Sequence, residues 1–110
     1  MGMIYYPAEY DSLAQVLAAA VEQAATGKGN DRHANGQPFD RQPMVEISKM
    51  VGLGFPLGQV QKKAQEAALL SAAGDTEKAQ AEILGAINYL AGAYIVLGMP
   101  LSSSENSDNR

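Results

Sequence analysis

Two glutamates flank a Gly-Asp pair in the second half of the chain, within "KKAQEAALLSAAGDTEKAQAEILGAINYL". Glu66 lies eight residues before Gly74 and Glu82 lies eight residues after it, so an antiparallel helical hairpin would place both at about the same level. Facing carboxylates bind divalent cations such as Mg²⁺ through their oxygen atoms, and Glu46 is a candidate third ligand. The alternative is that both glutamates are ordinary solvated charges on helix surfaces. The sequence does not decide between the two, since it leaves the rotation of the helices open.

A long polar segment over residues 27–42, "GKGNDRHANGQPFDRQ", is the second candidate site. Loops of this length are often functional in compact domains, and glycines, cations and an imidazole together suit a phosphate group. Two lysines near the start of a later helix add to the cations. The candidate ligand-binding residues are Lys28, Arg32, His33, Phe39, Arg41, Lys62 and Lys63. The open alternative is a solvated loop whose arginines pair with Asp31 and Asp40, together with ordinary surface lysines.

Four helices are expected to position these groups. The recurrence of apolar residues at helical spacing predicts helices over 11–26, 43–51, 57–73 and 76–97. Gly74 ends the third helix and Asp75 caps the fourth, so the last two helices form a long antiparallel hairpin. The glycine-rich stretch "GLGFPLG" breaks the chain before this hairpin. Strand-forming runs are nearly absent, which predicts an all-α fold.

The predicted organisation is one helical domain with a short segment at each end. Residues 1–10 form an N-terminal arm, 11–99 the helical domain, and 100–110 a disordered polar tail. Gly85 and Gly92 make a smooth seam along the fourth helix, which indicates close helix contact either within the chain or between copies. Because a domain of this size has a limited core, oligomerisation is a common way to enlarge it.

Charge and composition exclude several classes of function. The chain has 110 residues and a net charge of -4, which argues against general nucleic-acid binding. It has no cysteine and a single histidine, which excludes disulfides, thiolate metal sites and multi-histidine sites within one chain. The N-terminus lacks the pattern of a signal peptide, and the longest apolar stretch is short for a membrane span. We therefore expect a cytoplasmic protein without membrane association.

The hairpin resembles the MazG-like all-α nucleoside triphosphate pyrophosphohydrolases, a superfamily with many phage-encoded members. The matching stretches are "KKAQEAALL" and "AEILGAINYL", and the resemblance covers roughly residues 59–98. In that family a Glu-Glu-x-x-Glu helix and a Glu-x-x-Asp helix bind Mg²⁺ within an oligomeric bundle. The resemblance thus implies a four-helix MazG-like bundle that forms homo-oligomers, in the host cytoplasm if the protein is phage-encoded.

The metal motif of that family is degenerate in this chain. Leu69 stands at the third acidic position of the first motif, and Gly85 or Ala86 at the aspartate position of the second. Neither alanine nor glycine offers a side-chain oxygen. The resemblance therefore implies only two metal ligands in this chain, Glu66 and Glu82, and Mg²⁺ as the ion.

Three functions are consistent with these features. The favoured one is a protein that binds a nucleotide, or a related phosphate ligand such as a cyclic nucleotide, with little or no hydrolysis. The phage-type resemblance further implies that it could sequester a signalling nucleotide of host defence. The alternatives are a Mg²⁺-dependent nucleoside triphosphate pyrophosphohydrolase with an atypical site, and a helical protein–protein interaction module.

Overall fold

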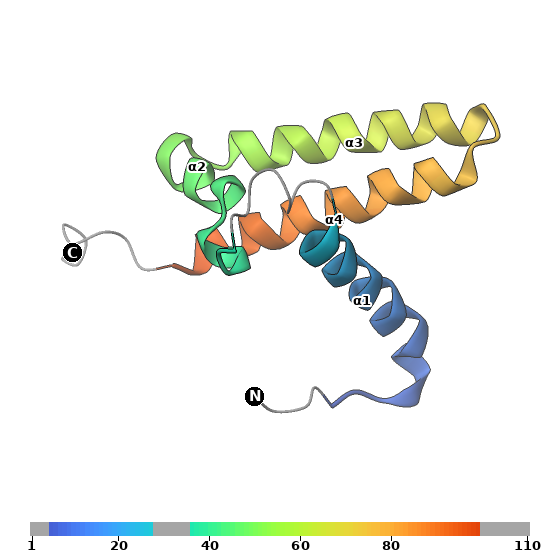
Figure 1. Cartoon of the computed structure of the whole chain (residues 1–110), viewed down its shortest axis with the longest axis horizontal. Coiled ribbons are helices and arrows are strands. Elements are labelled where there is room, and N and C mark those ends of the chain that lie inside the picture. Colours follow the sequence, from blue (N-terminus) through green and yellow to red (C-terminus); the bar gives the residue numbers. More distant parts are fainter. Residues whose placement is uncertain (1–4, 28–35, 100–110) are drawn as a thin grey trace.

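The computed structural model describes residues 5–27 and 36–99. These residues contain helices and no strand, so the predicted all-α class is confirmed (Figure 1). The α-helices are α1 (Asp11–Thr26), α2 (Pro43–Val51), α3 (Gly54–Ala72) and α4 (Thr76–Gly98). Two short 3₁₀ turns, η1 (Ala8–Tyr10) and η3 (Phe39–Arg41), precede α1 and α2. The expectations for Lys28, Arg32, His33 and the C-terminal tail lie outside the described residues.

Helices α3 and α4 form the antiparallel hairpin that the sequence predicts (Figure 1). Gly74 adopts a φ of 85°, which glycine reaches without steric cost. The Asp75 N–H donates to the Leu70 carbonyl at 2.9 Å, and the Gly74 N–H donates to the Ser71 carbonyl at 3.0 Å. This pair of bonds is a Schellman motif, which satisfies the last carbonyls of α3. The Asp75 carboxylate then accepts from the Lys78 N–H at 3.1 Å and caps α4.

The bounds of α1 and α2 agree with the prediction, whereas α3 starts three residues before the predicted position 57. The glycine-rich break is confined to Gly52, with a φ of 99°, and Leu53. Pro56 is the third residue of α3, where a missing N–H costs nothing because the first N–H groups of a helix have no acceptor within it. Proline at this position therefore belongs to the helix rather than to the break.

The core is built mainly from small side chains where the hairpin meets α2 and the end of α1. Small residues let helix backbones approach closely, but they leave little room for large apolar side chains in the interior. The fully buried non-glycine residues are Ala20, Val45, Ser48, Pro56, Ala67, Ala79 and Ala93. Most of the large leucine, isoleucine and tyrosine side chains of α1 and α4 are consequently exposed or only half-buried.

The glycine seam of α4 makes its contacts within the chain. A methyl group at position 85 would stand 3.0 Å from Cδ and Cε of Lys63 on α3. A methyl group at position 92 would overlap the sulfur of Met44 on α2. Gly85 thus makes room for a lysine side chain, and Gly92 lets α2 pack against α4.

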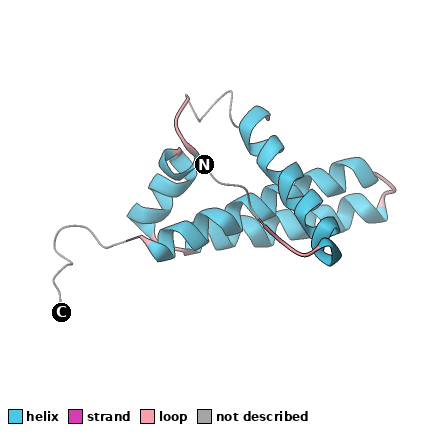
Figure 2. Ribbon diagram, turned by 90° about the horizontal axis from the view of Figure 1, so that it is seen from below, coloured by secondary structure: helices cyan, strands magenta, loops and turns pink. Residues whose placement is uncertain are grey.

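Helix α1 leaves the hairpin at an angle, so only its C-terminal half touches α4 (Figures 1 and 2). The Asn88 side-chain amide on α4 donates to the carbonyl of buried Ala20 at 3.0 Å. One turn further along α1, the Gln23 side-chain amide donates to the Ala81 carbonyl at 3.4 Å. Helices α1 and α2 therefore pack against the hairpin of α3 and α4. That this arrangement is a MazG-like bundle remains a prediction.

Within the described residues, α4 is the one helix that is long and apolar enough to cross a membrane, judged by length and composition. A central helix of a soluble protein passes the same test. The expected lack of membrane association is therefore still a prediction.

Candidate functional site: a cleft between α1, α2 and the hairpin

A cleft of about 520 Å³ lies where the end of α1, the η3–α2 segment and the hairpin meet. This volume falls within the range of small-molecule sites, roughly 300–1,000 Å³. Backbone and apolar side chains supply the remainder of the walls. The polar and aromatic residues that line the cleft are Gln23, Phe39, Gln42, Phe55, Lys63, Asn88 and Tyr89.

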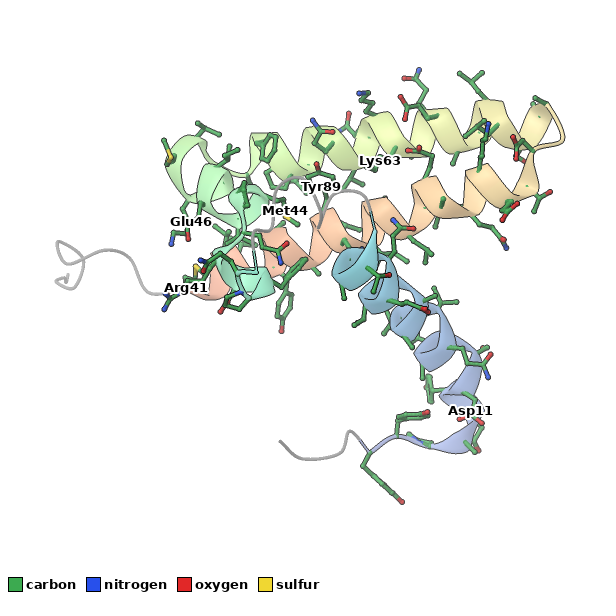
Figure 3. The ribbon with its side chains drawn as sticks, in the orientation of Figure 1. Asp11, Arg41, Met44, Glu46, Lys63 and Tyr89 are labelled. Atoms are coloured by element: carbon green, nitrogen blue, oxygen red, sulfur yellow. The ribbon has the colours of Figure 1, made fainter. Side chains whose placement is uncertain are left out.

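Lys63 is the only charged residue among the described residues that line this cleft. Its aliphatic stem crosses α4 at Gly85, which has no Cβ in its way. Its Nζ lies 3.3 Å from Oε1 of Glu82 and 6.0 Å from the centroid of the Tyr89 ring (Figure 3). The Lys63 and Glu82 side chains are 26% and 28% exposed. The ammonium group is therefore held in place and partly shielded from water, where its charge is less screened.

Three aromatic rings contribute to the cleft from different elements. Phe55 on α3 and Tyr89 on α4 pack edge to face, with ring centroids 6.0 Å apart and an interplanar angle of 83°. Phe39, in the η3 turn before α2, is half-buried and also lines the cleft. Phe39 also borders an adjoining, more apolar cavity of about 530 Å³. The cleft therefore offers aromatic surface close to a single cation.

Three amide side chains complete the polar lining. Their nitrogens donate to backbone carbonyls: Gln23 to Ala81 at 3.4 Å, Gln42 to Gln37 at 2.9 Å and Asn88 to Ala20 at 3.0 Å. Each amide also carries an oxygen that can accept a hydrogen bond. These oxygens are suited to N–H donors of a ligand, such as an exocyclic amine.

The structure brings only part of the predicted anion pocket together. Phe39 and Lys63 line the same cleft. Lys62 is exposed on α3 and does not line the cleft, because successive residues of a helix point roughly 100° apart. Arg41 is exposed on η3 and lies away from Lys63 (Figure 3). Lys28, Arg32 and His33 lie outside the described residues.

The two predicted metal ligands line a different, shallow depression of about 480 Å³ towards the turn of the hairpin. Glu66 and Glu82 are therefore close to the same level, as their spacing predicts. Lys78 also lines this depression, and the ion pair with Lys63 already engages Glu82. Glu46 lies on α2 instead, 3.3 Å from Lys49 (Figure 3). Across residues 5–27 and 36–99, no three acidic, histidine or cysteine side chains are grouped as a metal site requires.

Gln23, Phe55 and Tyr89 are among the cleft residues that reasoning from sequence missed. Tyr89 follows Gly85 by four residues, so both share one face of α4. In this structure the Lys63 side chain crosses α4 on that face, at Gly85, and ends near the Tyr89 ring. Asn88 also lines the cleft, and its amide nitrogen joins α4 to α1.

Comparison with known protein families, with curated proteins and with solved structures finds no match. The MazG-like resemblance consequently rests on the residues of the hairpin alone.

Proposed function

We propose that the protein binds a nucleotide, or a nucleotide-derived phosphate ligand, in the cleft around Lys63, with little or no hydrolysis. The observation that carries this proposal is the presence of one anchored cation and several aromatic rings in a single cleft of ligand-sized volume. The amide oxygens of the lining add acceptors for a base.

Lys63 is the group that would meet the phosphate. A lysine ammonium has three donors, and the ion pair with Glu82 engages it at 3.3 Å. The N–H groups of Lys63 that do not face Glu82 can donate to one phosphate group. The negative charge of Glu82 would repel a ligand that carries more phosphate charges. The cleft is therefore better suited to a ligand with few phosphate charges, such as a monophosphate or a cyclic nucleotide, than to a triphosphate.

Aromatic rings supply the part of the affinity that does not depend on charge. Stacking of a base on an aromatic side chain contributes roughly 1–3 kcal/mol. Phe39 is half-buried at the junction of the two adjoining cavities, so a base placed there would contact a ring that is already ordered. The edge-to-face pair of Phe55 and Tyr89 adds further aromatic surface to the same cleft.

A thermal-shift screen tests the proposal directly. A specific ligand raises the melting temperature by mass action, so inorganic phosphate, nucleosides, nucleoside mono- and triphosphates and cyclic dinucleotides are compared at equal concentration. At least one phosphorylated nucleoside should stabilise the wild-type protein more than phosphate or nucleoside alone. Lys63→Gln should abolish that shift, and Lys62→Gln, the matched control on the exposed side of α3, should retain it. Absence of any nucleotide-dependent shift would refute the proposal.

A second candidate function is Mg²⁺-dependent pyrophosphate release, because Glu66 and Glu82 line one depression. Metal-assisted phosphate chemistry needs several carboxylates to hold the ion, and here one of the two is engaged by Lys63. The pyrophosphate released from nucleoside triphosphates in the presence of Mg²⁺ decides between the two functions. Turnover that Glu66→Gln abolishes would assign the activity to this depression.

Binding without turnover would allow the protein to withhold a signalling nucleotide, the role that the phage-type resemblance implies. We also propose that the protein is cytoplasmic and forms a homo-oligomer. The homo-oligomer is supported by the small core, which leaves many large apolar side chains outside the single chain.

A further inference from the structure

Helices α1 and α4 together expose apolar side chains that no other part of residues 5–27 and 36–99 covers. On α1 these are Leu13, Leu17 and Val21, which are 53%, 45% and 66% exposed and recur every four residues. On α4 they are Leu90, Tyr94 and Leu97, which are 47%, 81% and 71% exposed. These six residues define the α1–α4 face. At about 100 Å² each they leave roughly 600 Å² uncovered, close to the approximately 800 Å² that each partner buries in a standard interface.

The α1–α4 face carries almost no charge. Residues 83–98 contain no Asp, Glu, Lys or Arg, and α1 contains only Asp11 and Glu22. The cores of protein interfaces are depleted in charged residues in the same way. Two copies of a chain with a net charge of -4 would repel each other through charged surfaces. A face without charges is therefore where this chain can meet a copy of itself.

The position of α1 indicates what covers the face. Its N-terminal half, with Leu13 and Leu17, projects away from the hairpin (Figure 1). A helix of 16 residues is about 24 Å long, and isolated helices only slightly shorter are marginally stable in water. The apolar row of α1 therefore needs a second surface, and the exposed row of α4 needs a helix. Among the described residues, α1 is hydrogen-bonded to α4 of its own chain at Ala20 and Gln23, towards the C-terminal end of α1, which leaves Leu13 and Leu17 without a helix to pack on.

We propose that the protein forms a two-fold dimer in which α1 of each copy packs on the exposed row of α4 of the other. A two-fold contact uses the same surface twice, so one arrangement covers both unpartnered rows. The dimer would also close the adjoining cavity at the α1–α4 junction, which is lined by Val21, Ala25, Ala91 and Ile95. The inference does not depend on ligand binding, because it concerns the free protein.

Sedimentation velocity of the full chain across a concentration series tests the dimer. The wild-type protein should sediment as a dimer, whereas Leu17→Glu and Leu97→Glu should each give a monomer. Leu69→Glu is the matched control: Leu69 is 68% exposed but lies on α3, outside the face, so this variant should remain dimeric. A monomeric wild-type protein would overturn the inference, as would dimers that survive both substitutions. A monomer that binds phospholipid vesicles through this face would assign the face to a membrane instead.

Chemical cross-linking keeps the test decisive if a charged variant fails to fold. The chain has no cysteine, so single-cysteine variants carry one reactive thiol each. Mixing Leu17→Cys with Leu90→Cys and adding a short bis-maleimide should yield a linked pair of chains. Mixing Leu69→Cys with Leu90→Cys should yield little. Equal cross-linking in the two mixtures would overturn the proposed arrangement.

Discussion

Gly85→Ala is expected to leave the free energy of unfolding nearly unchanged, although alanine is normally the better helix former. Glycine inside a helix costs about 1 kcal/mol relative to alanine. The new methyl group would stand 3.0 Å from Cδ and Cε of Lys63, whereas carbon atoms prefer roughly 3.5–4.0 Å. The lysine stem must therefore move aside, and leaving a favoured rotamer costs about 0.5–1.5 kcal/mol. The gain and the cost cancel to within about 0.5 kcal/mol.

Two comparisons isolate the contact with Lys63. Gly58 lies inside α3, and a methyl group there meets nothing within 4 Å, so Gly58→Ala should stabilise the protein by the full amount of about 1 kcal/mol. In a Lys63→Ala background, Gly85→Ala should recover the same gain. The double-mutant cycle should therefore report a coupling of about 0.5–1.5 kcal/mol between positions 63 and 85.

Urea denaturation followed by circular dichroism measures these differences, at one fixed protein concentration because the proposed dimer would contribute to stability. The displaced ammonium group should also bind a phosphate ligand more weakly in Gly85→Ala than in Gly58→Ala. If both alanine variants were equally stabilised, with the same ligand affinity, Lys63 would not lie across Gly85 and the description of the cleft would be wrong.

Three further changes test the hairpin and its link to α1. Asp75→Ala should lower the free energy of unfolding by about 1 kcal/mol, because it removes the carboxylate that caps the Lys78 N–H. Asp75→Asn should retain most of that stability, because asparagine is also a good helix cap. Urea denaturation measures both differences. Gly74→Ala should cost about 1 kcal/mol or more, because φ is 85° there; a neutral result would contradict the turn geometry. Asn88→Ala removes the hydrogen bond to the Ala20 carbonyl, so it should cost about 1 kcal/mol and speed hydrogen exchange in α1. Unchanged exchange would show that this bond does not hold α1.

The sequence predicted the helices well because their ends are marked by local chemistry. The Gly74–Asp75 pair and Pro43 mark helix ends through backbone conformation and capping, which depend on adjacent residues. The start of α3 was placed too late, because a proline in a first helical turn has the same local signature as one in a break. Local patterns therefore located the elements but not every boundary.

The site was less predictable, because it depends on helix rotation and crossing. The adjacent lysines Lys62 and Lys63 have the same sequence context, yet only Lys63 lines the cleft. That difference follows from how α3 is turned relative to α4. The glycine seam could likewise have served an internal or an intermolecular contact. The packing of Lys63 against Gly85 and of Met44 against Gly92 places it inside the chain.

The most direct test of the central claim is to map where a bound nucleotide contacts the protein. Backbone amide chemical shifts of the full chain are followed by NMR during titration with the nucleotide that stabilises the protein most. We predict that the largest changes cluster at Phe39, Lys63 and Asn88, around the cleft. Changes centred on Glu66 and Leu69, which line the other depression, or the absence of any localised change, would contradict this prediction.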